Sequence, residues 1–412
     1  MAKLLQINIT ANWGSHGKIA EGIGNIAISH GWDSYIAYGR WFNPSKSHLF
    51  HIGSMLDERI HGVMSRLFDI HGLMSKYATK QLITYIEKIN PDIIHLHNIH
   101  GYYLNYPLLF KYLAKTNKPV VWTLHDCWAF TGHCAHYMYI GCDKWKSHCY
   151  KCPQIHAYPK SILFDNSKKN FALKKEFFLL PQHLVLVPVS KWLEKDVKQS
   201  FLNKHKITQI YNGIDTHVFT PSATCEVFTK YEIQEGKRII LGVASNWYRK
   251  GLNDFVQLSE LIDNQYIIFL VGLNQKDIDS LPQNIIGVRR TQNVQELVEL
   301  YSAATVFFNP TWEDNFPTTN IEALACGTPV ITYNTGGSSE AIEKGTGYII
   351  NKGDVKSGLK KIIEITKNGK AYYTNICRNS VLKRFNKDER YNEYFDLYCK
   401  MLDDAIRELK GE

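Results

Sequence analysis

The chain contains 412 residues, a length that suits two or three compact domains with sizeable cores. Its composition, with 44% hydrophobic and 21% charged residues, excludes collagen-like, low-complexity and disordered proteins. The formal net charge of +9 favours ligands that carry phosphate or an anionic membrane face, although a solvated basic surface without a partner explains it equally well. No motif indicates binding of nucleic acid.

The apolar runs are too short to span a membrane. One of the longest, Tyr266 to Leu273, falls far below the ~18–20 residues that a bilayer requires. The N-terminal sequence MAKLLQINIT also lacks the features of a secretory signal. We therefore expect a cytoplasmic protein whose nine cysteines are mostly reduced thiols.

Short β-branched runs alternate with longer amphipathic stretches along both halves of the chain, a pattern typical of βαβ units and mainly parallel sheets. In the first half, strands are predicted at Leu4–Ile9, Asp92–Leu96, Val120–Leu124 and Val185–Val189. In the second half, they are predicted at Ile239–Val243, Tyr266–Val271, Val306–Asn309, Pro329–Tyr333 and Tyr348–Ile350. The sequence thus predicts an α/β protein with two doubly wound, Rossmann-like domains that face a central cleft.

Helical periodicity is clearest in two further regions. Residues 58–89 predict two amphipathic helices interrupted at Gly72, which we expect to pack on the N-terminal sheet, with a membrane-surface face as the alternative. A last helix is predicted from Tyr391 to Leu409, and its periodicity leaves open which domain it covers. The domains are expected at 1–222, with a cysteine-rich insertion at 134–152, and at 223–385, followed by a helical segment at 386–412 that packs back across them.

Three segments carry residue types suited to phosphate and sugar chemistry. Gly14 and Gly17 follow the first strand and precede a helix, where backbone N–H groups meet a phosphate or sugar, or where glycine serves turn geometry alone. Arg249 and Lys250 follow a strand and precede a helix, which suits a diphosphate clamp or two solvated loop charges.

The third segment runs from Glu313 to Val330 and is the most informative. Asp314 and Glu322 are eight residues apart, so a helix that begins near Thr319 would place both carboxylates beside one ligand. Carboxylates accept hydrogen bonds from paired sugar hydroxyls, and the N–H groups at a helix start bind phosphate oxygens. Capping of the helix by Asp314 is the alternative.

At these residues the chain resembles the family 4 glycosyltransferases of GT-B fold, and in particular the bacterial colanic-acid and capsule type. The resemblance spans nearly the whole chain, through the early glycine loop, Pro91–Asn98, Thr123–Asp126, Val189–Trp192, Asn212–Asp215, Arg249–Gly251, Asp314–Val330 and Gly336–Glu340. Each match alone is unspecific, and it is their order and spacing that indicate the family.

The resemblance implies roles for individual residues. Glu322 is expected to bind the ribose hydroxyls of a nucleotide-sugar donor, and Asp314, where the family usually has Glu, to lie near the donor sugar. His125 is expected to face that sugar, with a structural histidine as the alternative. Arg249 and Lys250 would neutralise the diphosphate, although Ala244-Ser245 stands where many members have an Arg. Sugar and phosphate would meet backbone groups of Asn315, Phe316, Pro317 and Thr318.

The reaction implied by the resemblance is a retaining transfer from a nucleotide-sugar, most often a UDP- or GDP-sugar, to a hydroxyl of a lipid-linked glycan acceptor. No catalytic metal is expected, because cations and helix dipoles stabilise the leaving diphosphate. The expected setting is surface-polysaccharide synthesis at the inner face of the cytoplasmic membrane. A nucleotide-sugar epimerase, a phosphorylase or a non-catalytic sugar-nucleotide-binding subunit of the same fold is the alternative.

Four cysteines cluster in the first half as Cys134-x7-Cys142-x6-Cys149-x2-Cys152, with His133, His136 and His148 among them. Four thiols in nineteen residues suit a structural zinc site, which would order a loop too polar to pack by itself. Free thiols, disulfides and an iron–sulfur cluster are the alternatives.

Overall fold

The computed structural model describes residues 1–223 and 226–410. The chain divides into two compact units: unit 1 comprises Met1–Tyr211 and Asp388–Glu412, and unit 2 comprises Asn212–Lys387. The sequence analysis placed the first division later, after residue 222. The segment Asn212–Pro221 therefore belongs to unit 2, where Ile214 forms a parallel bridge with Asn386.

A seven-stranded parallel sheet forms the centre of unit 1, in the order β3-β2-β1-β4-β5-β6-β7. Its strands are β1 (Lys3–Ala11), β2 (Asp33–Phe42), β3 (His48–His51), β4 (Ile93–Leu96), β5 (Val120–Leu124), β6 (Leu184–Pro188) and β7 (Lys206–Ile207). The helices are α1 (Gly14–Ser29), α2 (Met55–Phe68), α3 (Lys76–Ile89), α4 (Tyr106–Thr116), α5 (Ser167–Phe178), α6 (Lys191–Gln199) and α14 (Lys387–Lys410), with 3-10 turns η1 (Trp128–Phe130), η2 (Lys144–Lys146) and η3 (Phe201–Lys204).

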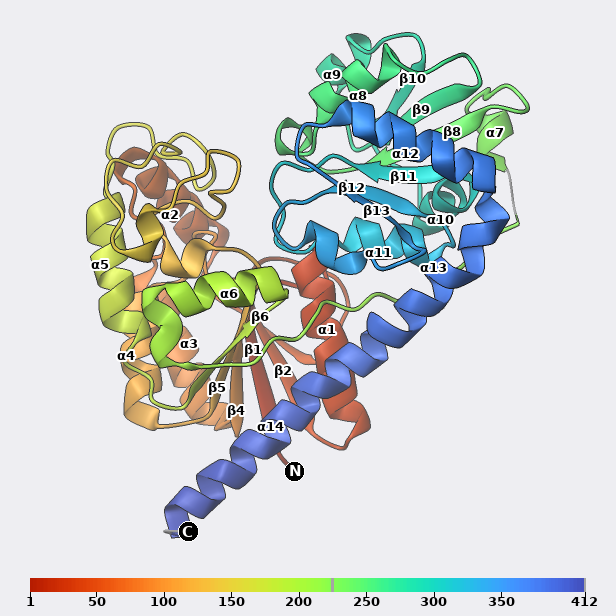
Figure 1. Ribbon diagram of the computed structural model, residues 1–412. Helices are drawn as coiled ribbons and strands as arrows, with labels where there is room; N and C mark the ends of the chain where they lie inside the picture. The colour runs from red at the N-terminus through yellow and green to blue at the C-terminus, as the bar shows by residue number, and fades with distance from the viewer. Residues whose placement is uncertain (224–225, 411–412) are drawn as a thin grey trace. The chain divides into compact units, whose positions relative to one another are not determined.

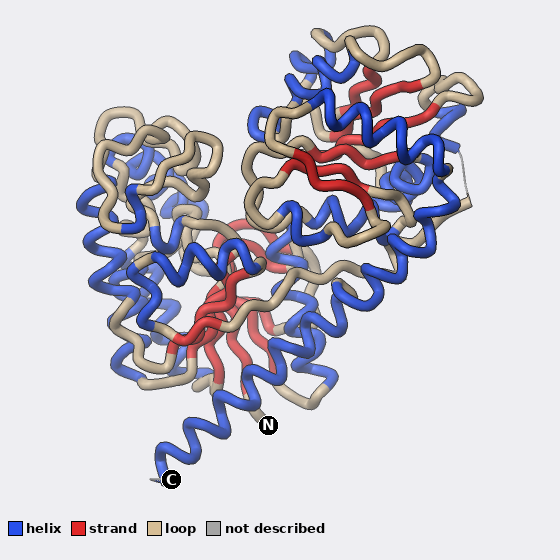
Figure 2. Tube along the Cα trace, viewed as in Figure 1, coloured by secondary structure: helices blue, strands red, loops and turns tan. Residues whose placement is uncertain are grey.

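Unit 2 repeats this architecture with six parallel strands in the order β10-β9-β8-β11-β12-β13. The strands are β8 (Arg238–Val243), β9 (Tyr266–Val271), β10 (Ile285–Val288), β11 (Val306–Asn309), β12 (Val330–Tyr333) and β13 (Gly347–Ile350). Around them lie α7 (Glu226–Lys230), α8 (Leu252–Ser259), α9 (Gln275–Asp279), α10 (Val294–Ala303), α11 (Thr318–Ala325), α12 (Val355–Asn368) and α13 (Lys370–Arg384), with η4 (Trp247–Arg249) and η5 (Ser338–Ala341). Figure 2 shows the strands of each unit between helices.

The two sheets confirm the predicted fold class, and every predicted strand is present within one or two residues of its predicted bounds. Most of those strands are buried and mainly apolar, as expected where helices cover both faces of a parallel sheet, whereas β13 at the edge of its sheet is largely accessible to solvent. Four strands were not predicted: β2, β3, β10 and the two-residue β7. Gly39 and Arg40 interrupt the apolar pattern of β2, β3 has partly or fully exposed side chains, and β10 contains Gly287.

The two helices predicted within residues 58–89 are α2 and α3, and they differ in the face that they bury. Helix α3 buries Leu82 and Ile86 among others, as expected for a helix packed on the sheet. Helix α2 is inverted: its buried residues are Glu58, His61, Gly62 and Ser65. Its apolar residues Met55, Leu56, Ile60 and Val63 are exposed. The expectation that both helices pack through apolar faces is therefore wrong for α2.

Helix α14 completes the core of unit 1, which settles what periodicity left open. Tyr391, Tyr394, Leu397, Tyr398 and Met401 belong to one buried apolar cluster with residues of β1, β4, β5, β6 and α1. Two of its tyrosines also reach the sheet by hydrogen bonds: the Tyr398 hydroxyl lies 2.5 Å from Nδ1 of His95, and the Thr123 hydroxyl donates to Tyr394 Oη over 3.1 Å. Figure 1 shows α14 beside α1.

In the part of the chain that the structure describes, no helix is long and apolar enough to cross a membrane.

The close approach of α14 to α1 gives a stability prediction. A Cβ at Gly22 would lie 2.2 Å from Cε2 of Tyr391, so Gly22→Ala forces the helices apart and should lower the free energy of unfolding by about 1–3 kcal/mol in urea titrations. Gly62→Ala in α2 is the matched control, because the nearest atom to its Cβ would be 3.6 Å away. That variant should gain about 0.5–1 kcal/mol. Equal effects of the two variants would contradict the packing of α14.

Candidate active site

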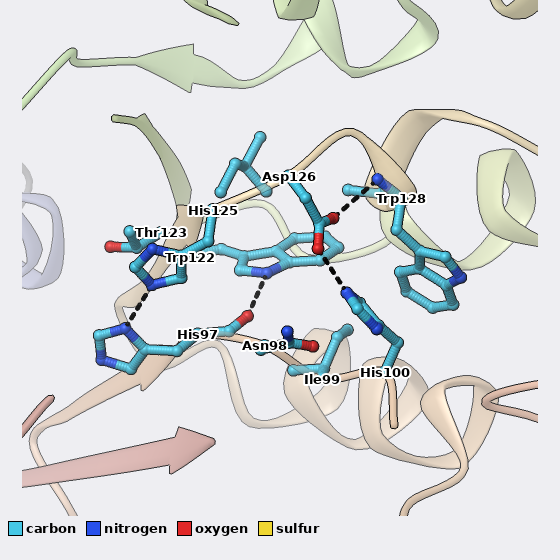
Figure 3. Close-up of a pocket in the computed structure, with 11 residues that line it drawn as sticks. His97, Asn98, Ile99, His100, Trp122, Thr123, His125, Asp126 and Trp128 are labelled. Carbon is cyan, nitrogen blue, oxygen red and sulfur yellow. Dashed lines mark hydrogen bonds and ion pairs between the residues drawn. The ribbon is translucent and has the colours of Figure 1, made fainter. Parts of the chain in front are cut away.

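A polar pocket lies at the carboxyl ends of β4 and β5 in unit 1, the edge where parallel α/β sheets place their ligand sites. Figure 3 shows its lining. The residues after β4 contribute His97, Asn98, Ile99 and His100, and the end of β5 and the residues after it contribute Trp122, Thr123, Leu124, His125, Asp126, Trp128 and Ala129. The predicted site residue His125 therefore lies among several polar side chains that the sequence analysis did not single out.

A chain of hydrogen bonds fixes the tautomer of His125. The amide nitrogen of Gln6 donates to the Ala20 carbonyl over 2.8 Å, so Gln6 Oε1 accepts from Nε2 of His97 over 2.9 Å. His97 Nδ1 then accepts from Nε2 of His125 over 3.3 Å. His125 consequently keeps its lone pair on Nδ1. Burial, followed by the neighbouring His97, holds the pKa of His125 well below its usual value, so the ring is neutral near pH 7.

His100 and Asp126 form the second polar group of the pocket. Nε2 of His100 lies 2.7 Å from Oδ2 of Asp126, and Nδ1 lies 3.0 Å from the Tyr158 hydroxyl. The Trp128 N–H donates to the other carboxylate oxygen over 2.9 Å. Burial alone would raise the pKa of Asp126, but the charge and hydrogen bond of His100 outweigh it and keep the carboxylate ionised.

The glycine loop of the sequence analysis is the start of α1 at the same edge. Gly14 has φ +66° and a Cβ there would meet open space, as a ligand-facing position requires. At Gly17, glycine is required for packing instead, because a Cβ there would lie 2.5 Å from Oγ1 of Thr10. Between them, His16 lies 3.1 Å from Oδ1 of Asn8, and its ring centroid is 6.0 Å from that of His125. The structure therefore brings Gly14 and His125 to one region of unit 1.

The other predicted site residues lie in unit 2, where two ion pairs organise the group. Arg249 pairs with the fully buried carboxylate of Glu313, and Lys250 pairs with Asp314. Lys250 Nζ also donates to the Glu313 carbonyl over 3.2 Å. The side chains of Arg249 and Lys250 are still 24% and 22% exposed, so a solvent-borne anion reaches both cations. The pairing of Arg249 with Glu313 was not predicted.

Asp314 and Glu322 flank the start of α11. The Phe316 N–H donates to Oδ1 of Asp314 over 3.1 Å, which is a turn before the helix rather than a cap of α11. Oε2 of Glu322 accepts from the Tyr301 hydroxyl over 3.0 Å, so a buried tyrosine orients this carboxylate. Helix α11 begins at Thr318 after Pro317, one residue before the predicted start. Asn315 and Phe316 are buried, and the Phe316 ring lies 5.6 Å from that of Phe385.

The four predicted zinc ligands lie together in unit 1, outside the pocket described above. Cys134, Cys142, Cys149 and Cys152 line one small cavity in the long loop between β5 and α5. None of the four is in a disulfide.

Comparison with family models identifies the class of protein. The model "Glycosyltransferase Family 4" matches residues 29–218, and "Glycosyl transferases group 1" matches residues 225–380. The chain belongs to the family 4 glycosyltransferases of GT-B fold and is a glycosyltransferase, as the sequence indicated.

Two curated relatives illustrate the match. The chain is 24% identical over 380 residues to the putative colanic acid biosynthesis glycosyl transferase WcaC of Escherichia coli K12, covering 85% of this chain and 88% of the relative. It is 24% identical over 219 residues to N,N'-diacetylbacillosaminyl-diphospho-undecaprenol alpha-1,3-N-acetylgalactosaminyltransferase of Campylobacter jejuni, covering 50% of this chain and 56% of that protein.

Solved structures share the fold along the whole chain. Sucrose-phosphate synthase from Thermosynechococcus elongatus superposes with a TM-score of 0.71 at 16% identity, over 98% of this chain and 100% of that one. Anabaena HepE in complex with UDP-glucose gives a TM-score of 0.63 at 13% identity, over 96% and 100%.

The buried histidines of unit 1 predict how stability depends on pH. Burial, followed by neighbouring histidines, lowers the pKa values of His95, His97 and His125 well below 6.5. The unfolded chain therefore takes up protons that the folded chain does not. The free energy of unfolding should be constant above about pH 6.5 and should fall below it, by up to about 1.4 kcal/mol per pH unit for each such histidine. Urea titrations between about pH 7.5 and about pH 5 measure this slope. It should be shallower in His97→Gln, and an unchanged slope would contradict the assignment.

Proposed function

We propose that the protein transfers a sugar, with retention of configuration, from a nucleotide-sugar donor to a hydroxyl of a lipid-linked glycan during bacterial surface-polysaccharide synthesis. The observation that carries this proposal is the group in unit 2 that combines two accessible cations with the carboxylates of Asp314 and Glu322. The names of the relatives support it: one is assigned to colanic acid synthesis, another acts on a diphospho-undecaprenol acceptor, and HepE was solved with UDP-glucose.

Each part of the donor has a chemical match in unit 2. Glu322, oriented by the Tyr301 hydroxyl, offers a carboxylate to the paired hydroxyls of a ribose. Lys250 and Arg249 neutralise the diphosphate, Lys250 as a point charge and Arg249 through its planar fork. Their pairing with Asp314 and Glu313 holds them in place before the donor arrives, so less side-chain entropy is lost on binding.

The chemistry requires stabilisation of charge more than proton transfer. As the sugar–phosphate bond breaks, negative charge grows on the diphosphate, and Lys250 and Arg249 stabilise it electrostatically. A donor phosphate oxygen takes the proton of the acceptor hydroxyl, which then attacks from the face that the diphosphate leaves. The resemblance to the family assigns His125, a neutral ring in the pocket of unit 1, to a contact with the donor sugar.

Donor binding gives the direct test of this site. Glu322→Gln removes the charge that the ribose hydroxyls would meet, and a hydrogen bond to a charged group contributes about 1.5–3 kcal/mol, so the dissociation constant should rise about 10- to 100-fold. Calorimetric titration with a panel of UDP-, GDP-, ADP- and dTDP-sugars measures this, and one nucleotide series should bind the wild type.

Glu364→Gln is the matched control, because that exposed carboxylate on α12 pairs with Lys361 outside the site. Unchanged donor affinity in Glu322→Gln would overturn the site assignment. Conversion of donor without acceptor would instead indicate an epimerase, and a strict need for inorganic phosphate would indicate a phosphorylase.

The inverted helix α2 supports a peripheral position at the membrane. Met55, Leu56, Ile60 and Val63 are between 48% and 70% exposed on this helix. The exposed Ile162, Leu163 and Phe164 lie beside it, because the Ile162 N–H donates to the Arg66 carbonyl over 2.7 Å. Arg59 and Arg66 are exposed on the same helix. An apolar face with cations at its margin fits the interface of an anionic bilayer, where a lipid-linked acceptor would be found.

Vesicle binding tests this face. The double variant Ile60→Glu/Val63→Glu should lose at least about tenfold in affinity for vesicles of phosphatidylglycerol and phosphatidylcholine, since burial of one such side chain contributes about 1.5–3 kcal/mol. Co-sedimentation measures the bound fraction. Ile363→Glu is the control, because Ile363 is 37% exposed on α12 of unit 2. Equal binding by all three proteins would remove α2 from the membrane contact.

A further inference from the structure

The segment between β5 and α5, residues 125–166, is long for a connection in a compact domain. Its regular structure consists of the 3-10 turns η1 and η2, and Figure 2 draws most of it as loop. It nevertheless has an interior of its own: the ring of Trp145 lies 5.0 Å from that of Phe130 and 5.0 Å from that of Tyr137, and all three residues are buried. A loop of this length with little regular structure is usually functional or disordered, so the ordered interior of this one calls for a specific cause.

Sulfur atoms are gathered inside this loop. Cys134, Cys142, Cys149 and Cys152 line one cavity together with aromatic residues. Cys134 interacts with Cys152, and Cys149 interacts with Cys152 and Cys142. The four cysteines are far apart in the loop sequence. Their convergence on one cavity therefore brings together the ends of the three segments that lie between them.

Gly132 packs closely against one of the four cysteines. A Cβ at this position would lie 2.6 Å from Cβ of Cys149 and 2.2 Å from the Ser167 carbonyl oxygen. The backbone of the loop therefore approaches the cysteine cluster at a position where only glycine fits.

A buried cation beside the cluster lacks a carboxylate partner. Lys174 is fully buried, and its Nζ donates to the carbonyls of Trp128 and Thr131 over 2.6 and 3.0 Å. No ion pair among the described residues includes it. Thr131, which accepts one of these hydrogen bonds, lines the same cavity as the four cysteines, so Lys174 lies next to the cluster. Zinc with four thiolates carries a net charge of about −2, which gives this lysine a counter-charge.

A neighbouring group of ligand-type residues is held together by hydrogen bonds, and in the described part of the chain the buried Nε2 atoms of His71 and His133 have no hydrogen-bond partner. Among the described residues, Asp69, His71 and His133 form the one set of three whose ligand atoms lie within 4.8 Å of one another. Nδ1 of His133 lies 2.6 Å from Oδ1 of Asp69, and the Trp128 indole N–H donates to Nδ1 of His71 over 2.8 Å. These are hydrogen-bond distances. Asp69 thus orients His133, whose buried Nε2 has no hydrogen-bond partner and which lies beside Cys152.

We propose that Cys134, Cys142, Cys149 and Cys152 bind one Zn²⁺ ion as thiolates and that this ion is the structural cross-link of the loop. Binding releases the four thiol protons and forms four Zn–S bonds. Tetrahedral coordination requires the sulfur atoms to lie about 3.8 Å from one another. Without the ion, no three of the four sulfurs all lie within 4.8 Å of one another, so zinc binding would bring them closer. The zinc-bound loop carries Tyr158, whose hydroxyl contacts His100 in the active-site pocket. This inference does not depend on the proposed donor or acceptor.

Metal analysis of the full-length protein tests the site without an activity assay. Protein purified under reducing conditions without chelators should contain about one zinc ion per chain by plasma mass spectrometry. Cys149→Ser and Cys152→Ser should lower the content at least about tenfold. Cys399→Ser is the control in unit 1, because Cys399 lies on α14 outside the loop, and it should retain zinc.

A second measurement on the wild type covers the case in which the serine variants do not fold. Replacement of the metal by Co²⁺ should give the intense d–d and sulfur-to-cobalt charge-transfer bands of a tetrahedral thiolate centre. Chelation should lower the melting temperature of the wild type. Wild-type protein with neither zinc nor a thiolate–cobalt spectrum would overturn the proposal, as would stoichiometric iron in place of zinc. Loss of zinc in His133→Gln but not in Cys142→Ser would overturn the four-thiolate ligand set.

Discussion

Parallel pairing of β4 with β1 and β5 is the constraint on which the pocket of unit 1 depends. Because Gln6 pairs with His95 and Leu96 with Trp122 in register, the residues that follow β4 and β5 emerge at one edge of the sheet. Backbone pairing of the strands thereby places Gln6, His97 and His125 so that their side chains form a continuous chain of hydrogen bonds. A shift of one strand by one residue would turn these polar side chains to the other face and break this chain of hydrogen bonds.

A second set of side-chain hydrogen bonds lies two residues earlier on the same strands, at His95 and Thr123, and joins the strands to α14. His95 contacts both the Tyr398 hydroxyl and the Thr123 hydroxyl, and Thr123 in turn donates to Tyr394. All four side chains are buried, so each polar atom depends on its partner for the interactions that water would otherwise supply. Helix α14 therefore holds in place the strands that directly precede His97 and His125 of the candidate site.

The sequence predicted what depends on local pattern and missed what depends on contacts between distant segments. Strands such as β5 were predictable because a continuous apolar run covered on both faces has few other solutions. The inverted burial of α2 was not predictable, because its buried Glu58 and His61 are stabilised by Arg40 and Ser75 from other segments. The same is true of Arg249, whose partner Glu313 lies far along the chain, and of Gly17, whose need for a glycine arises from Thr10 on the preceding strand.

The docking of α14 has a consequence for synthesis on the ribosome. The core of unit 1 is built from residues of β1, α1, β4, β5 and β6 together with Tyr391, Tyr394, Leu397, Tyr398 and Met401. These last residues are translated after the whole of unit 2. The usual order, in which the first domain to emerge completes its folding first, is therefore not open to this chain. All residues of unit 2 are translated earlier, and the apolar face that α14 covers in unit 1 stays exposed until unit 2 has been synthesised.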